Sequence, residues 1–202
     1  MQMENTRRSN RERTETTRAD LLAAARRLFT EKSYAETGTP EIVAAAGVTR
    51  GALYHHFPDK QALFKTVVEQ EAKAVAEEIE QSSPETLSAR EALLQGSEAF
   101  LKAMRQPGRI RLLLLDGPAV LGRAAMDEID ARHGARTLRA GLAIAMREGA
   151  MKKLPLDALT ALLSSAFDRA ALAIDAGAST NEHMEVLTGI IDGLMTNQPA
   201  AS

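Results

Sequence analysis

Polar side chains suited to contact with nucleic acid gather in one short stretch that runs from Thr49 to His56. The stretch reads Thr-Arg-Gly-Ala-Leu-Tyr-His-His, and on a helix its leucine is the residue that falls at core spacing. Arginine can bind phosphate, while tyrosine, histidine and a small residue on the same short helix can reach into a DNA groove. The spacing therefore predicts a helix that presents a polar face to the groove and backbone of DNA.

Two predicted short helices position this face, one over about residues 40–46 and the next over about 49–56. Gly47 joins them in a tight turn, because glycine adopts a positive φ without steric cost and lets the second helix leave at a steep angle. We expect the following apolar residues to close a small core with the preceding helix: Ile42, Ala46, Val48, Leu53 and Phe57.

The remainder of the chain also reads as helices, since apolar residues recur at helical spacing and no strand signal stands out. We expect the first helix to open at Thr17, which forms a capping pair with Asp20, and to end near Lys32. Asp59 can cap a helix over about 60–81. Further helices are expected over about 86–105, 109–116, 119–149 (broken near Gly122 and Gly134), 156–176 and 181–196. The prediction is an all-α fold of about nine helices.

The region around the turn closely resembles the N-terminal DNA-binding domain of TetR-family transcriptional regulators. The most specific part is the run AAGVTRGALYHHF at residues 45–57, followed by Asp59-Lys60. Support comes from ARRLF at residues 25–29 and from Tyr34-Ala35 with Thr37, so the resemblance covers about residues 15–75. It implies a three-helix helix-turn-helix head followed by a C-terminal helical domain that binds a ligand and dimerises.

The resemblance also implies roles for single residues. Thr49 caps the recognition helix and can touch phosphate, while Arg50 and Ala52 lie at or near base edges. Lys60 binds phosphate at the N-terminus of the next helix, where its charge and the free N–H groups act together. The predicted DNA-contacting residues are Thr39, Thr49, Arg50, Gly51, Ala52, Tyr54, His55 and Lys60.

The chain departs from the family pattern at Gly38-Thr39, where a hydroxyl residue followed by an apolar one is usual. We therefore expect a looser entry to the first short helix, with Gly38 and Thr39 as alternative N-caps. Tyr34 and Phe57 are predicted core residues. His55 and His56 point about 100° apart on a helix, which makes a poor metal pair, so no metal or cofactor is predicted.

Charge is distributed unevenly along the chain, whose net charge is −2. Residues 1–60 hold ten Lys and Arg against eight Asp and Glu, whereas residues 61–202 hold fifteen against nineteen. A basic N-terminal arm with Arg7, Arg8, Arg11 and Arg13 is either a solvated tail or an arm that tracks DNA. Residues 69–85, with six Glu and one Lys, would be repelled by phosphate. The sequence thus predicts a mildly basic head on a mildly acidic body.

Several classes of function are excluded by what the sequence lacks. It has no cysteine, which excludes thiolate metal sites and a cysteine nucleophile. It has no secretory signal and no apolar run of about 18 residues, so no membrane span and a cytoplasmic location are expected. Beyond residue 76 no catalytic constellation or phosphate-binding loop is visible, which leaves an enzyme built on a helical bundle as a remote alternative.

The predicted body carries two apolar helical stripes and few aromatic residues. The last two helices are expected to pair two subunits in a four-helix bundle, with burial inside the subunit as the alternative. The predicted interface residues are Leu159, Leu162, Leu163, Ala166, Phe167, Ala170, Ile174, Met184, Leu187, Ile191 and Leu194. The predicted lining of an aliphatic ligand pocket, with core packing as the alternative, is Phe100, Met104, Leu114, Met126, Ile129, Met146 and Phe167.

Together these features divide the chain into a flexible basic arm (1–16), a helix-turn-helix domain (17–60) and a helical sensing and dimerisation domain (61–202). We expect a sequence-specific DNA-binding regulator, in the form of a ligand-responsive repressor that binds a pseudo-palindromic double-stranded operator as a homodimer. An activator, or a regulator that works without a ligand, is the alternative. The sequence identifies neither the small-molecule effector nor the operator.

Overall fold

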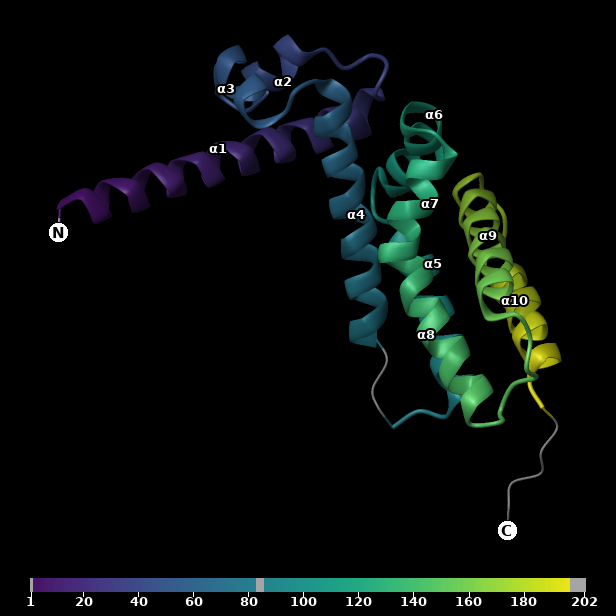
Figure 1. Ribbon diagram of the computed structural model, residues 1–202. Coiled ribbons are helices and arrows are strands. Elements are labelled where there is room, and N and C mark those ends of the chain that lie inside the picture. The colour runs from purple at the N-terminus through teal and green to yellow at the C-terminus, as the bar shows by residue number, and fades with distance from the viewer. Residues whose placement is uncertain (1, 83–85, 197–202) are drawn as a thin grey trace.

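The computed structural model describes residues 2–82 and 86–196, with side chains from residue 12 onward, and within these ranges the chain is helical (Figure 1). The expected all-α fold is confirmed. The helices are α1 (Gln2–Lys32), α2 (Thr39–Ala45), α3 (Arg50–His56), α4 (Lys60–Ser82), α5 (Ala89–Met104), a π-helical segment η1 (Ile110–Asp116), α6 (Gly117–Leu121), α7 (Arg123–Arg132), α8 (Gly134–Arg147), α9 (Leu156–Asp175) and α10 (Thr180–Leu194).

A small head forms where α2 and α3 pack on each other and on α1, which in turn packs on α4. Its centre is aromatic: the Phe29 and Phe64 rings meet edge to face at 5.1 Å, and the Tyr34 ring lies 4.9 Å from that of Phe64. Phe57 is buried and Tyr34 is half-buried, which confirms both as core residues. Edge-to-face pairs add to the area term of burial, so a few rings hold this small domain together.

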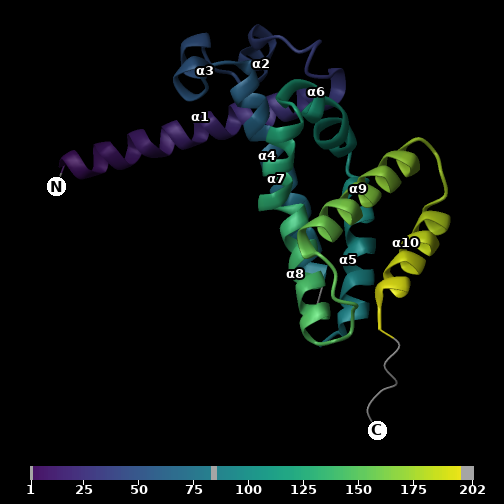
Figure 2. The ribbon, with the colours of Figure 1, turned by 45° about the vertical axis from the view of Figure 1, so that its right-hand side comes forward.

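The first helix is longer than the sequence predicted. α1 begins at Gln2 and runs without interruption through Thr17 and Asp20, so the predicted helix start at Thr17 is wrong. The capping pattern was misleading because a threonine and an acid three residues on also occur within helices. The polar N-terminal half of α1, which precedes Arg18, projects away from the head and the core (Figures 1 and 2).

The body is a bundle of α5, α7, α8, α9 and α10 against the length of α4. α5 lies between α4 and α10, and α8 packs on α5, α4 and α9 (Figure 2). The predicted break near Gly122 is confirmed, since Gly122 separates α6 from α7 at a φ of +81°. Because α4 packs on both the head and the body, it joins the two mechanically.

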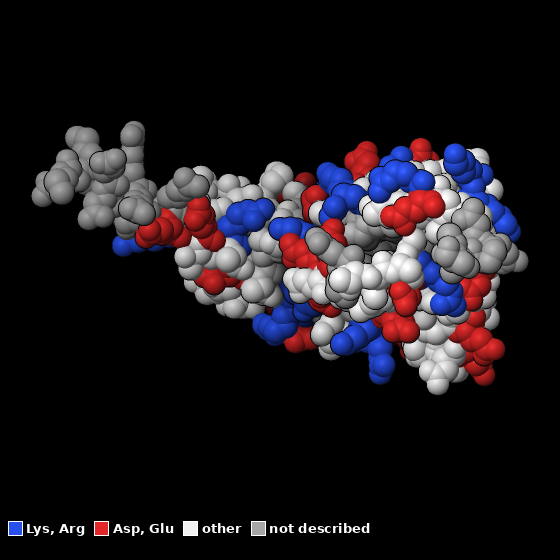
Figure 3. Space-filling view, turned by 90° about the horizontal axis from the view of Figure 1, so that it is seen from below, with Lys and Arg blue, Asp and Glu red and all other residues white. Residues whose placement is uncertain are grey.

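The predicted N-cap of α4 is present in the structure. Asp59 caps α4, since its Oδ1 accepts from the backbone N–H of Ala62 at 2.7 Å. Acidic and basic side chains are intermixed over the end of the body away from the head (Figure 3). No helix in the described ranges is long and apolar enough to cross a membrane.

Candidate nucleic-acid interface and internal cavity

The turn that orients α3 has the predicted geometry. Gly47 adopts a φ of +65°, a value that a side chain would strain, and links α2 to the N-cap of α3. Thr49 is that cap, since its Oγ1 accepts from the backbone N–H of Ala52 at 3.2 Å. Gly38 caps α2 without a side-chain hydrogen bond, which resolves the ambiguity with Thr39.

One face of α3 points away from the core and carries the predicted contact residues. Leu53 is completely buried and anchors the helix, whereas Arg50, Gly51, Tyr54 and His55 are exposed. Tyr54 leaves 41% of its surface exposed, although a large aromatic side chain ordinarily packs against the core. An exposed face with these side chains on a capped helix can enter a major groove with its N-terminal end first.

A small polar cluster fixes the tyrosine on this face. The Thr39 hydroxyl at the start of α2, and after it the Arg50 guanidinium, favour the ionised form of the Tyr54 hydroxyl and so lower the pKa of Tyr54. The guanidinium also lies over the Tyr54 ring at 5.5 Å. The structure thus brings together three of the residues that the sequence predicted as DNA contacts, and gives Thr39 a positioning role that the sequence did not indicate.

Lys60 is placed differently from the expectation. Its ammonium donates to the backbone carbonyls of Tyr34 at 2.8 Å and Thr37 at 2.9 Å, and lies 3.9 Å from the centre of the Tyr34 ring. Burial lowers the pKa of Lys60. Two of its three N–H donors therefore close the loop between α1 and α2, and a phosphate contact from Lys60 stays a prediction.

The basic arm is described only in part. The side chains of Arg7, Arg8 and Arg11 lie outside the described residues, while Arg13 is exposed on α1. Arg18 is also exposed and stacks over the Phe57 ring at 5.2 Å, which places one positive charge beside the end of α3. Desolvation, followed by the neighbouring His55 and Arg18, lowers the pKa of His56.

The body contains a cavity of about 910 Å³ that is partly open to solvent and is bounded by residues from α4 to α9. Five of the seven predicted pocket residues line it: Phe100, Met104, Leu114, Met126 and Ile129. Met146 and Phe167 do not, because both are buried in the helix packing, where the Phe167 ring meets that of Phe100 at 5.8 Å. The sequence did not single out Asp130 and Asp168 in the lining, since carboxylates at helical spacing read as a solvated face.

The head is tied to the wall of this cavity through η1. Leu113 and Leu114 of η1 line the cavity, and two residues later Asp116 Oδ2 accepts from the backbone N–H of Tyr34 at 2.9 Å. A second link joins Gln61 Nε2 to the Val120 carbonyl at 2.8 Å. A change in the cavity wall can therefore reach the head through two hydrogen bonds, neither of which the sequence revealed.

The predicted pairing stripe is divided by the structure into an inner and an outer set. Five of its residues are buried in the chain's own core: Leu163, Phe167, Ala170, Leu187 and Ile191. Leu162 of α9 is the one predicted residue that is exposed, with 71% of its surface, and the other five are half-buried. Val186 and Ile190 of α10, which are not in the predicted set, are 61% and 40% exposed. The inner set holds α9 and α10 to the body, so any pairing surface lies on the outer set.

An N-capped recognition helix on a small head, joined to a helical body with a large cavity, defines a helix-turn-helix regulator with a separate C-terminal domain. The family model described as "Bacterial regulatory proteins, tetR family" matches residues 21–67, and the one described as "Tetracyclin repressor-like, C-terminal domain" matches residues 90–197. The chain belongs to the TetR family, and it is a DNA-binding transcriptional regulator.

Individual relatives agree with this assignment. A crystal structure of a TetR-family transcriptional regulator from Pectobacterium atrosepticum is 32% identical, with a TM-score of 0.74 over 94% of this chain and 99% of that one. The HTH-type transcriptional repressor AcnR of Corynebacterium efficiens is 27% identical over 84% of this chain and 88% of its own length. The HTH-type transcriptional regulator AcrR of Shigella flexneri is 44% identical over 31% of this chain and 29% of its own length.

Proposed function

We propose that this regulator is a ligand-responsive repressor that binds a pseudo-palindromic operator as a homodimer. In this proposal two copies place their α3 helices in successive major grooves, about 34 Å apart along the duplex. The contact residues are Thr39, Thr49, Arg50, Gly51, Ala52, Tyr54, His55 and Lys60. Because bacterial operators lie on the chromosome, the protein acts in the cytoplasm.

The observation that carries the ligand response is the link from the cavity to the head. η1 contributes Leu113 and Leu114 to the cavity wall and, through Asp116, holds the backbone of Tyr34 at the base of the head. Suppose that the protein has two conformations, which differ in the distance between the two heads. A ligand that binds the cavity of one conformation more tightly shifts the population toward that conformation, by an amount set by the difference in affinity. If the favoured spacing does not match successive grooves, the operator is released.

Dimerisation is supported by the exposed apolar residues of α9 and α10. Leu162, Val186 and Ile190 are large and exposed on neighbouring helices of a single protomer. A two-fold interface is self-complementary, so two such helices from each copy can form a four-helix bundle. A stable interface of this kind would fix the distance between the two recognition helices.

Repression is tested by footprinting the protein across the DNA upstream of its own gene, together with measurement of transcript levels in a deletion strain. We expect a protected pseudo-palindrome and increased transcription of the adjacent gene in the deletion strain. Decreased transcription with the same footprint would contradict repression and favour the alternative, an activator. Absence of any protected site would contradict the operator itself.

A further inference from the structure

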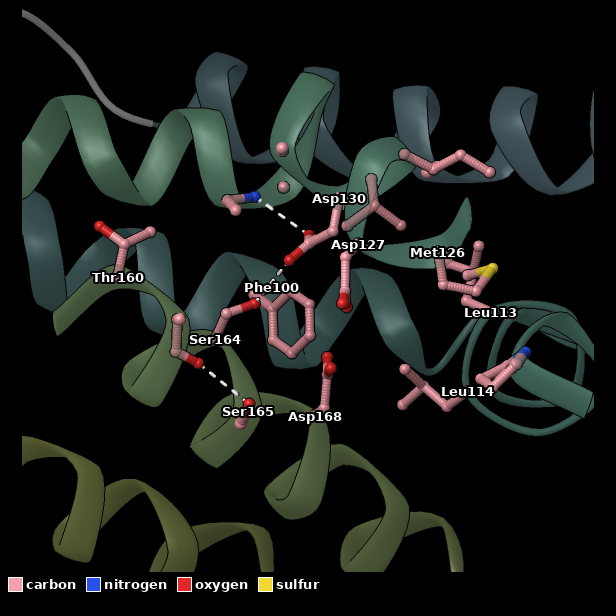
Figure 4. Close-up of a pocket in the computed structure, with 18 of the residues that line it drawn as sticks. Phe100, Leu113, Leu114, Met126, Asp127, Asp130, Thr160, Ser164, Ser165 and Asp168 are labelled. Carbon is pink, nitrogen blue, oxygen red and sulfur yellow. Dashed lines mark hydrogen bonds between the residues drawn. The ribbon is translucent and has the colours of Figure 1, made fainter. Parts of the chain in front are cut away.

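The cavity in the body has a largely apolar wall. It holds about 910 Å³, and its apolar side is formed by Phe100, Met104, Leu113, Leu114 and Met126. Leu113, Leu114 and Met126 gather at one end of the cavity, while Phe100 lies among the polar residues at the other (Figure 4). A cavity of this volume accommodates an organic molecule of drug-like size that presents an apolar body to these side chains.

The polar side of the same cavity carries four carboxylates, of which Asp157 pairs with Arg139. Asp127 and Asp130 come from α7 and Asp168 comes from α9, and the carboxylates of Asp127 and Asp168 point toward one another beside the Phe100 ring (Figure 4). Asp130 is already satisfied, since it accepts from the Ser164 hydroxyl at 2.9 Å and from the Ala135 N–H at 3.1 Å. Among the described residues, no hydrogen bond or ion pair engages Asp168.

Positive charges around the cavity are engaged elsewhere or exposed to solvent. Arg139 pairs with Asp157 at 2.8 Å, and both side chains are more than half exposed. Arg123 pairs with Asp127 at 3.5 Å, with 74% of its side chain exposed. Arg169 is exposed. The lining therefore leaves Asp130 and Asp168 as the less exposed charges, without a cation in direct contact.

Burial makes a charged Asp168 costly in the absence of a ligand. Desolvation first, and then the nearby Asp130, raises the pKa of Asp168 to about 7, while Arg123 acts in the opposite direction. Burial also raises the pKa of Asp130. A cation placed between these groups would offset the cost, since an opposite charge within about 4–6 Å favours the ionised carboxyl.

We infer that the effector of this regulator is an organic cation with an apolar body, held by Asp168 beside the Phe100 ring. The inference rests on the proposed ligand response and specifies its chemistry. The aromatic face of Phe100 contributes a cation–π contact, and the aliphatic and methionine end of the cavity takes the rest of the molecule. An anion of the same shape is disfavoured, because it would meet the Asp168 carboxylate, which no arginine in the described part of the chain contacts.

The test compares two ions of nearly identical shape and opposite charge. Tetraphenylphosphonium and tetraphenylborate are titrated into the full-length protein by isothermal titration calorimetry. We expect the phosphonium to bind and the borate to bind at least about tenfold more weakly, because direct charge contacts in a desolvated site carry discrimination of this order. Equal affinities, tighter binding of the borate, or no binding of the phosphonium would overturn the inference.

Two variants assign the charge preference to the cavity. Asp168→Asn is nearly isosteric and should lower phosphonium affinity about tenfold or more. Glu128→Gln removes the same charge from an exposed position on α7 that does not line the cavity, and should leave the affinity unchanged. Equal loss in both variants would mean that general electrostatic attraction, not the cavity, selects the cation, and would overturn the assignment.

A second measurement keeps the inference testable if Asp168→Asn fails to fold. The phosphonium carries a permanent charge, so a pH effect on its affinity reports the protein alone. Because the proton on Asp168 must leave before the cation is paired, affinity should rise about tenfold from about pH 6 to about pH 8. A flat profile would exclude Asp168 as the partner of the cation.

The outcome is separable from that of the proposed repressor function. Operator binding is measured by fluorescence anisotropy without any ligand, and the phosphonium is then added to the preformed complex. Phosphonium binding that leaves the operator complex intact would support a cation site but contradict its role as the effector site. Operator binding by a protein that takes up neither ion would contradict the inference and leave DNA recognition standing.

Discussion

Arg109 donates from Nε to Glu71 Oε2 at 3.1 Å, and both side chains are almost completely buried, at 7% and 9% exposure. The other oxygen of Glu71 accepts from Arg26 of α1 at 2.5 Å, so one carboxylate on α4 joins α1 to the residue that precedes η1. Arg109 also donates to Glu78 and to the Ala103 carbonyl. Arg109 is thus the centre of an internal ion network that joins α1, α4 and η1.

We predict that Glu71→Gln lowers the free energy of unfolding by about 3 kcal/mol, because Arg26 loses its carboxylate partner and the buried Arg109 is left with the half-exposed Glu78 as its counter-charge. Chemical denaturation with urea measures this change. Glu77→Gln is the matched control on the same helix, since Glu77 is exposed and pairs at i,i+4 with Lys73. It should cost less than about 0.5 kcal/mol. Similar losses in the two variants would contradict a special role for the buried network.

The same network makes stability sensitive to acid. Burial opposes ionisation of Glu71, but the hydrogen bonds from Arg26 and then Arg109 outweigh it and lower the pKa of Glu71. A depressed pKa in the folded state contributes stability above the unfolded pKa, and this contribution is lost as the pH falls through the folded value. Glu71→Gln should therefore flatten the acid side of the stability profile relative to the wild type.

Whether an interaction could be predicted from the sequence depends on how far apart its two residues lie along the chain. Gly47, Thr49 and Asp59 act on neighbours within four residues, and their roles as turn and caps could be predicted. The Arg109–Glu71 pair and the Tyr34–Asp116 hydrogen bond join residues 38 and 82 positions apart. Such contacts depend on how helices pack, which local spacing does not encode.

The same limit applied to the cavity and to the pairing face. Periodicity identified the apolar stripes of α9 and α10, but it could not divide each stripe between the chain's own core and its outer surface. Leu162 and Leu163 are adjacent in sequence and differ completely in burial. The carboxylates of α7 and α9 converge only because the two helices lie on opposite sides of the cavity.

A substitution at Ala52 tests whether α3 contacts the edges of the bases. Ala52→Gln should shift the preferred operator sequence toward adenine at the contacted position, because a glutamine side chain pairs with adenine in the major groove with about 1–3 kcal/mol of discrimination. Selection from a randomised DNA library measures the preference. Ala44→Gln on the exposed side of α2 is the control and should leave the preference unchanged. A uniform loss of affinity with no change of preference would show that Ala52 does not face the bases.

The variant Lys60→Ala distinguishes a DNA contact of this lysine from a structural role. We predict that Lys60→Ala weakens binding to operator and to random DNA alike and reduces the salt dependence of log K by about one unit of slope. It should also destabilise the head by about 1–3 kcal/mol, since the carbonyls of Tyr34 and Thr37 lose their donor. Anisotropy at several salt concentrations measures the slope and thermal unfolding measures the stability. Lower stability with an unchanged slope would remove Lys60 from the phosphate contacts.

Asp168 makes the ligand-free protein less stable as the pH rises. Its pKa is 3.8 when unperturbed and about 7 in the fold, so between these values the folded state holds a proton that the unfolded state has lost. Stability from this group therefore falls as the pH rises through that window, by on the order of 4 kcal/mol at about 1.4 kcal/mol per pKa unit. Asp168→Asn should be more stable than the wild type at about pH 8, with the difference shrinking near about pH 5. Urea unfolding at both pH values measures this, and a wild type that matches the variant at both would contradict the raised pKa.

The outer face of α9 and α10 determines whether the chain pairs. Leu162→Glu places a charge on a residue that is 71% exposed in a single protomer, so it leaves the protomer's own core intact. If two copies meet on this face, the charge is desolvated in the interface, and we expect the dimer to dissociate to a folded monomer with weakened operator binding. Sedimentation velocity measures the mass, and circular dichroism confirms that the helices remain.

The control is Leu115→Glu on η1. Leu115 is also a leucine and is 52% exposed, so this variant should stay dimeric. A Leu162→Glu variant that remains dimeric would mean that the subunits pair through a different surface.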